Sequence, residues 1–246
     1  MSTFLLIILA SLITSLISFI GIIIINEKIK AKLLYYLVSF AAGVLLATAF
    51  LDLLPEAQEG VGQNSIFLPA LLGIVLFFFL ERIIILLHHH DDDKPVIHAS
   101  VTLVLIGDSI HNFFDGIAIA AAFLINPSLG FTTTLAIIIH EIPHEIADYS
   151  VFIKGGLDQM KALFYNFISA LTAVIGGIMG YYFLSIFEKF NYITISMTAG
   201  IFIYIACTDL IPEVQRDYKE HRKWTQTFSF LCGIVIIYFL QTFIKH

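Results

Sequence analysis

Charged side chains are scarce in this 246-residue chain. Only 13% of its residues are Asp, Glu, Lys or Arg, against about a quarter in a typical soluble domain, while 59% are hydrophobic. The mean hydropathy is +0.91. This composition excludes an ordinary soluble domain and indicates a membrane protein. The net charge of −6 also argues against a nucleic-acid partner, which would require a basic surface.

Cysteine is almost absent as well. The two cysteines, Cys207 and Cys232, lie in apolar stretches, and we interpret them as small core residues. They therefore indicate nothing about the redox compartment.

Long apolar runs, in contrast, fill the sequence. Roughly 20 residues are needed to cross about 30 Å of hydrocarbon, and eight windows are long enough. They leave little for a soluble domain, so we expect one polytopic all-α membrane domain over residues 1–246, embedded in the lipid bilayer. The first window is expected to be a span and not a cleaved signal peptide, because no basic residue precedes it. The windows are about 3–25, 34–54, 66–87, 97–124, 131–153, 162–187, 192–213 and 225–244.

Basic residues are missing from one side of these windows. Eleven of the 13 Lys and Arg residues lie in the regions after the first, third, fifth and seventh windows, and only Lys189 and Lys245 lie on the other side. Because basic loops stay in the cytoplasm, we expect a multi-pass protein of the cell membrane with both termini outside. The segment 88–98, HHHDDDKPVIH, would then be cytoplasmic, either as an accessory metal-capturing loop or as a hydrated linker.

An internal repeat relates the second and seventh windows. Residues 39–56, SFAAGVLLATAFLDLLPE, align without a gap to residues 196–213, SMTAGIFIYIACTDLIPE, with eight identities in eighteen positions. One copy runs outward and the other inward, so the repeat is inverted. Inverted repeats that flank a central site are frequent in transporters.

The fourth and fifth windows lie between the two copies and carry ionisable side chains within apolar sequence. Charges at bilayer depth cost at least about 2.5 kcal/mol each and normally face a cavity. Neither polar stretch has a Lys or Arg, so a bound cation is the expected partner. Imidazole and carboxylate ligands together suit zinc, and also iron, manganese, cobalt, copper or cadmium. The residues that share a face on each helix are Asp108, His111, Asn112 and Asp115 on one, and His140, Glu141, His144 and Asp148, with Glu145 at the flank, on the other.

Residues 140–144, HEIPH, also match the H-E-x-x-H helix of zinc metalloproteases, in which the Glu is the general base. An intramembrane protease is therefore the alternative, and a metal-binding membrane protein without flux is a third possibility. Pro143 argues against the protease, because proline kinks the helix that must hold both histidines. The surplus of candidate ligands instead favours two adjoining sites or a path.

Together, HNFFDG (111–116) and HEIPHEIAD (140–148) resemble the signatures of the ZIP (Zrt-/Irt-like) metal transporter family. The nearest subgroup has a HExPHExGD motif, from which this chain departs at Ala147. The resemblance covers the whole chain. It implies eight spans in a 3+2+3 arrangement, uptake of zinc into the cytoplasm without enzymatic activity, and a homodimer.

The resemblance also implies a binuclear site. The primary position would use His111, Asp115, His140 and His144, and the second position would use Asn112, Asp115, Glu141 and His144. Glu145 matches the motif as a ligand or as a supporting residue. Where some members add a glutamate from the sixth span, this chain has Ala173, so the second position is expected to be weaker or to hold no metal. Asp108, Asp52 and Asp209 are candidates for the metal path or for structural hydrogen bonds.

The charge distribution makes a topology prediction. In a cysteine-free background, Gln63→Cys should react with a membrane-impermeant maleimide added outside intact cells, whereas Lys28→Cys and Arg222→Cys should react only after permeabilisation. Labelling of Gln63→Cys from the cytoplasmic side would refute the predicted orientation.

Overall fold

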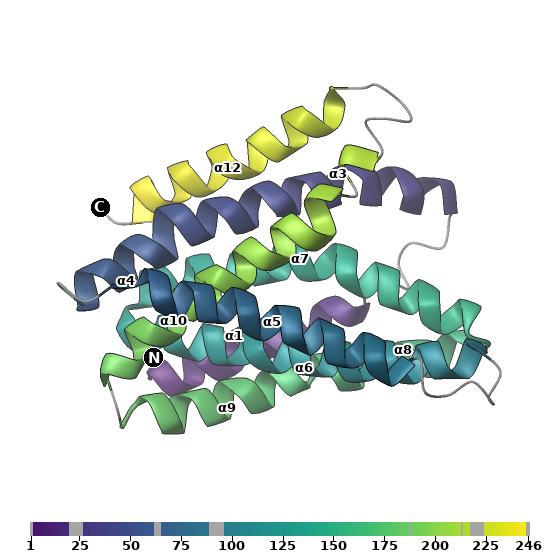
Figure 1. Ribbon diagram of the computed structural model, residues 1–246, viewed down its shortest axis with the longest axis horizontal. Coiled ribbons are helices and arrows are strands. Elements are labelled where there is room, and N and C mark those ends of the chain that lie inside the picture. The colour runs from purple at the N-terminus through teal and green to yellow at the C-terminus, as the bar shows by residue number, and fades with distance from the viewer. Residues whose placement is uncertain are drawn as a thin grey trace.

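The computed structural model describes residues 2–19, 27–61, 65–88, 96–186, 188–212, 214–216 and 224–244 (Figure 1). The segment 88–98 that was predicted to capture metal lies mostly outside these residues. The helices are α1 (Thr3–Leu16), α3 (Glu27–Thr48), α4 (Leu54–Val61), α5 (Phe67–His88), α6 (Val96–Ile125), α7 (Pro127–Lys154), α8 (Gln159–Ala170), α9 (Thr172–Leu184), α10 (Glu188–Ile205) and α12 (Thr225–Ile244), with a 3₁₀ turn η1 (Ile17–Phe19) and two π-helical segments, η2 (Ala49–Leu53) and η3 (Ala206–Leu210).

The prediction of an all-α membrane protein is confirmed, and the described part of the chain contains no strand. Where the structure describes them, the eight predicted windows lie in one helix or in consecutive helical segments. The acids of α7 lower its mean hydropathy, and the apolar helix Thr3–Phe19 is shorter than a full span. Within the described residues, the segments long and apolar enough to cross a bilayer are Tyr36–Gly60, Val104–Ile125, Gln159–Leu184, Phe190–Arg216 and Thr225–Thr242.

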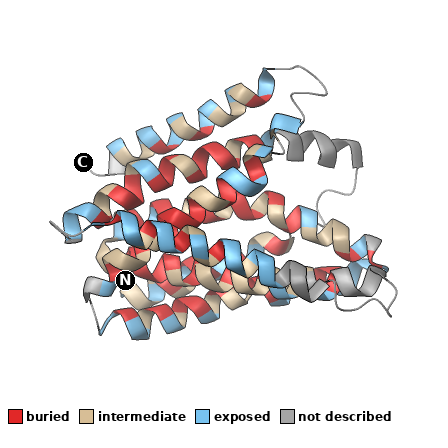
Figure 2. Cartoon of the chain, in the orientation of Figure 1, coloured by how far each residue is buried: buried red, intermediate tan, exposed pale blue. Residues whose placement is uncertain are grey.

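Large apolar side chains cover the outer helix faces, as expected where a protein meets lipid. On α12, Phe228, Val235 and Phe239 are all exposed, and Figure 2 shows exposed residues along this helix and buried ones in the middle of the bundle. Cys207 and Cys232 are also exposed, so their interpretation as core residues is wrong. An outward position in an apolar medium suits a small apolar thiol as well as a core position does.

Small residues let the central helices approach closely. α6 packs along α9, and a side chain at Gly116 would meet the Ala173 carbonyl while one at Gly176 would meet the Phe113 carbonyl. A run of buried small and apolar residues, 118–122, continues this contact. Close approach of helix backbones through such residues is the usual means of association within membranes, where apolar side chains gain little by leaving lipid.

The two copies of the repeat have matching structures. α3 and α10 run in opposite directions along the long axis (Figure 1), and their π-helical segments η2 and η3 occupy the same aligned positions. Ser39 donates a hydrogen bond to the Gln226 carbonyl at the start of α12 (2.5 Å), and Ser196 donates one to the Ile66 carbonyl just before α5 (2.6 Å). Both contacts hold a repeat helix against the helix that follows its partner copy.

This symmetry includes α5 and α12, which the comparison of residues 39–56 with 196–213 did not cover. A side chain at Gly43 would meet the Phe230 carbonyl, and one at Gly200 would meet the Ala70 carbonyl. The sequence contains a signal for this longer repeat, since LLGIVLFFFL (71–80) and LCGIVIIYFL (231–240) share six of ten residues. The repeat unit is therefore a pair of helices.

Gly43 and Gly200 make equivalent contacts, so a side chain added at either position should destabilise the protein in the same way. Gly43→Ala and Gly200→Ala should each lower the free energy of unfolding by about 1–3 kcal/mol, because the added methyl group forces two backbones apart. The measurement is thermal loss of the monodisperse chromatographic peak in detergent. Thr194→Ala is the control, because the Thr194 hydroxyl bonds within its own helix to Phe190. A melting temperature for either glycine variant that equals that of the control would contradict the close packing.

Candidate metal site

A one-residue turn at Asn126 joins the two polar helices. The Asn126 side chain accepts a hydrogen bond from the Leu129 N–H (2.8 Å), and Pro127 takes the first position of α7, where its missing N–H is not needed. The predicted apolar windows, about 97–124 and 131–153, lie within these two helices, and the Asn-Pro pair starts α7 directly after α6. His111 precedes Asn126 by 15 residues and Glu141 follows it by 15, so an equal rise of ~1.5 Å per residue brings them to the same level.

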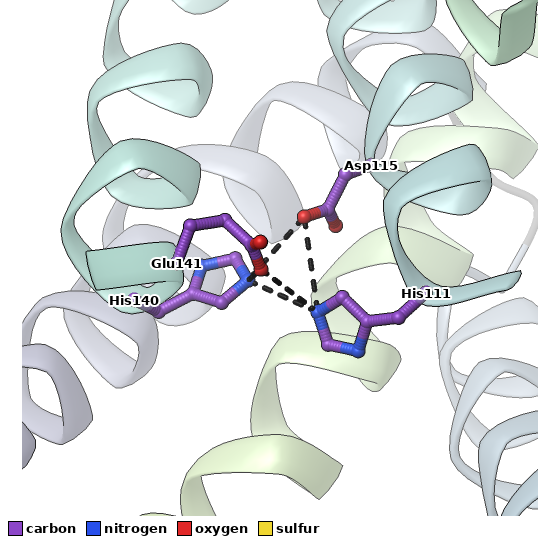
Figure 3. Close-up of side chains that lie close together, drawn as sticks. All are labelled: His111, Asp115, His140 and Glu141. Atoms are coloured by element: carbon purple, nitrogen blue, oxygen red, sulfur yellow. Dashed lines mark hydrogen bonds and ion pairs between the residues drawn. The ribbon is translucent and has the colours of Figure 1, made fainter. Parts of the chain in front are cut away.

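Four of the predicted ligands meet at this level (Figure 3). The Nε2 atoms of His111 and His140 are 3.2 Å apart. Oε1 of Glu141 lies 3.3 Å from the first and 3.2 Å from the second. Oδ2 of Asp115 lies 3.8 Å from His111 Nε2 and 3.4 Å from His140 Nε2.

These separations suit one tetrahedral ion. Zinc holds nitrogen and oxygen ligands at ~2.0–2.2 Å, which places the ligand atoms of a tetrahedron roughly 3.4 Å from one another. Nδ1 of His140 lies 3.1 Å from the Ala136 carbonyl, and donation of its proton there leaves the Nε2 lone pair for a metal. Pro143 does not interrupt α7, which continues from Pro127 to Lys154 with His140 and Glu141 in place.

Protein buries three members of this cluster and leaves His111 partly exposed. His140, Glu141 and Asp115 are each at most 2% exposed. The ring of Phe77 on α5 packs 5.6 Å from that of His111, and the ring of Phe202 on α10 packs 5.7 Å from that of His140. The sequence has no Lys or Arg between residues 95 and 153 to neutralise the acids from within α6 or α7. A buried set of two imidazoles and two carboxylates is therefore best stabilised by a cation.

The other predicted ligands are placed differently. The Asn112 amide donates to Oδ1 of Asp108 (2.8 Å) and to the Asp108 carbonyl (3.1 Å), so it is held within its own helix. The ring of His144 lies 5.5 Å from that of His111, yet its ligand atoms do not belong to the four-residue group. Asp148 joins no group of candidate ligands among the described residues.

A second group of acids lies one helical turn away. Asp108, Glu141 and Glu145 each place a carboxylate oxygen within 4.8 Å of the others, and all three are buried. The sequence predicted Asp108 to lie on the polar face, as a group of the metal path or of a structural hydrogen bond, but its spacing did not indicate which residue of α7 it faces. The neighbouring α8 contributes Asn166, whose amide donates to the Glu145 carbonyl (3.3 Å) and which no motif indicated.

The remaining candidates take separate positions. Ala173 is fully buried beside α6, so that position adds no acid to the site. Asp52 is buried and accepts a hydrogen bond from the Thr132 hydroxyl of α7, whereas its counterpart Asp209 is exposed and accepts one from Thr208. The two aspartates of the repeat are therefore in different environments.

Comparison with known proteins gives a family for the chain. The model of a family described as "ZIP Zinc transporter" matches residues 1–101 and 89–241. "Zinc transporter ZIP10" of Danio rerio is 36% identical over 151 residues, which are 58% of this chain and 18% of that protein. "Zinc transporter ZIP13" of Pongo abelii is 29% identical over 227 residues, 85% of this chain and 67% of that protein. "Metal cation symporter ZIP14" of Xenopus tropicalis is 34% identical over 149 residues, 57% of this chain and 32% of that protein.

The geometry predicts which ligands bind zinc. Zinc at 100 times its dissociation constant should stabilise the purified protein by about 2.7 kcal/mol. We expect His140→Ala to lose most of this shift, because it removes a ligand from the group of four. Asn112→Ala should retain the shift, because the Asn112 amide is held by Asp108. The measurement is thermal unfolding in detergent with and without zinc. Loss of the zinc shift in Asn112→Ala, in protein that is stable without zinc, would place Asn112 among the ligands.

Proposed function

The chain belongs to the ZIP zinc transporter family, and we propose that it carries divalent transition metal, zinc in particular, from outside the cell into the cytoplasm. The chain spans less than a quarter of the length of several relatives that it matches, among them ZIP10 of Danio rerio and "Zinc transporter foi" of Drosophila melanogaster, of which it covers 18% and 20%. Transport is therefore inferred for this chain from its own residues.

The observation that supports the proposal most strongly is the group of His111, Asp115, His140 and Glu141. Its atoms are spaced for a tetrahedral ion, and its mixture of nitrogen and oxygen ligands suits zinc, with iron, manganese, cobalt and cadmium as further candidate substrates. We infer that His144, Glu145, Asn112 and Asp148 act around this position, as neighbouring ligands or as residues along the path.

The proposed architecture is a single domain of eight spans in a 3+2+3 arrangement, in the cell membrane and assembled as a homodimer. The symmetric packing of α3 on α12 and of α10 on α5 supports the inverted outer units. The start of α1 and the end of α12 both lie at the left end of the bundle in Figure 1, as an even number of spans requires. The distribution of Lys and Arg supports an outside position for that end, so the metal would leave inward past Asp209 and past Glu213, which lies outside the described residues.

An intramembrane protease is a poorer explanation. A catalytic zinc needs three protein ligands, an open water position and a free general base. Oε1 of Glu141, the residue that would be the base, lies against both histidines, 3.3 and 3.2 Å from their Nε2 atoms. This position supports a ligand role for Glu141. The relatives named above are called transporters or a symporter.

Zinc flux tests the proposal. Purified protein in liposomes should carry zinc down an imposed gradient, and His140→Ala and Glu141→Ala should each reduce the initial rate at least tenfold, since each removes a ligand at the centre of the path. Glu59→Gln, which removes an exposed acid on α4, is the matched control. Zinc binding without flux in the unaltered protein would refute transport, and cleavage of a membrane peptide that Glu141→Ala abolishes would identify a protease.

A further inference from the structure

We propose that Asp108, Glu141 and Glu145 form a carboxylate-only cation site that takes a divalent cation with a preference for oxygen ligands, such as Mn²⁺. This site rests on the proposed function, because it adjoins the zinc position and extends it. It differs from the second position implied by the family resemblance, which would use Asn112, Asp115, Glu141 and His144. Glu141 is the residue that both sites share.

The heights of the residues along α6 and α7 explain why these three acids meet. Asp108 precedes Asn126 by 18 residues and Glu145 follows it by 19, so both lie one turn beyond the level of His111 and Glu141. One oxygen from each of Asp108, Glu141 and Glu145 falls within 4.8 Å of the other two. The site is thus displaced toward the ends of the two helices that adjoin Val96 and Lys154.

Each acid of this group has at least one oxygen without a hydrogen-bond partner among the described residues. Oδ2 of Asp108, Oε2 of Glu141 and Oε2 of Glu145 are buried and accept no hydrogen bond from any described residue. The Ser169 hydroxyl lies near Asp108 but donates to carbonyls of its own helix, those of Tyr165 (3.1 Å) and Asn166 (2.9 Å). Asp108 and the two glutamates are more than nine-tenths buried, so water does not compensate them. Buried oxygens left in this way are costly unless a cation binds them.

The donor set selects the class of cation. Three carboxylates and no imidazole suit ions that prefer oxygen, such as Mn²⁺, whereas the neighbouring histidines favour zinc. The amide of Asn112 occupies Oδ1 of Asp108, and Oδ2 of Asp108 remains without a hydrogen-bond partner among the described residues. A metal that leaves the histidines through Glu141 would therefore meet oxygen ligands next.

The test loads each site separately. Purified full-length protein receives one equivalent of Zn²⁺, which gives no paramagnetic signal, and is then titrated with Mn²⁺ while free Mn²⁺ is followed by electron paramagnetic resonance. The residues at 88–93 bind cations by their own chemistry, so His88, His89 and His90 are replaced by Ser and Asp91, Asp92 and Asp93 by Asn throughout. We expect one Mn²⁺ per chain with the zinc retained, as measured by elemental analysis after desalting.

Two variants should weaken only the second ion. Asp108→Asn and Glu145→Gln are expected to raise the Mn²⁺ dissociation constant roughly tenfold or more while each chain still holds one zinc, which also shows that the variant is folded. Glu59→Gln, the exposed acid of α4, should leave both ions bound. The site is refuted if Mn²⁺ fails to bind, if it displaces the zinc, or if neither variant weakens it.

A measurement on the protein that keeps Asp108 and Glu145 tests independently whether the two sites are adjacent. Loaded with two Mn²⁺ and no zinc, the chain should show an exchange-broadened spectrum, because ions that share Glu141 lie roughly 4 Å apart. Two unperturbed six-line signals would refute adjacency. Failure of zinc flux in liposomes would refute transport and leave this binding result intact, whereas zinc flux without bound Mn²⁺ would refute the carboxylate site alone.

Discussion

The turn at Asn126 is the constraint on which the metal site depends. Because a single residue separates α6 from α7, the two helices cannot slide relative to each other, and residues at equal distances from the turn face each other. His111 meets Glu141 in this way, and Asp108 meets Glu145 one turn further on. The same Asn126 donates a hydrogen bond to Glu56 (2.9 Å), which connects the turn to α4 and so to the repeat.

Buried charge explains why the surrounding helices pack as they do. Two carboxylates and two histidines in a low dielectric attract a cation strongly only if water is kept away. Phe77 on α5 and Phe202 on α10 pack against the two histidines, and these two helices belong to opposite copies of the repeat. On another side, small residues bring the backbones of α6 and α9 close together. Packing and chemistry therefore depend on each other here. A looser bundle would hydrate the acids, and a site without acids would give no reason to exclude water.

Much of this could be predicted from sequence, for reasons that differ by feature. Hydropathy locates the helices because the bilayer imposes their length, and the polar faces follow from helical periodicity. The structure brings His111, Asp115, His140 and Glu141 together, whereas the sequence prediction placed Glu141 in the second position and His144 in both. The pairing of Asp108 with Glu145 could not be predicted, because it depends on the one-residue turn at Asn126, which fixes how α6 and α7 face each other. The amide of Asn112 has a partner one turn away in its own helix, and helical periodicity does not decide between that partner and a metal.

The two copies of the repeat have the same backbone structure but differ in the hydrogen bonds that their polar side chains make. Asp52 is buried and bound to Thr132 of α7, while Asp209 is exposed. Gln241 donates to the Leu51 carbonyl within η2, whereas Glu81, at the aligned place on α5, accepts from Tyr204. Asp52 thus ties one copy to α7, whereas in the other copy Asp209 is bonded to a neighbour within its own π-helical segment. The repeat is therefore symmetric in its helix packing and asymmetric in the hydrogen bonds of its polar groups.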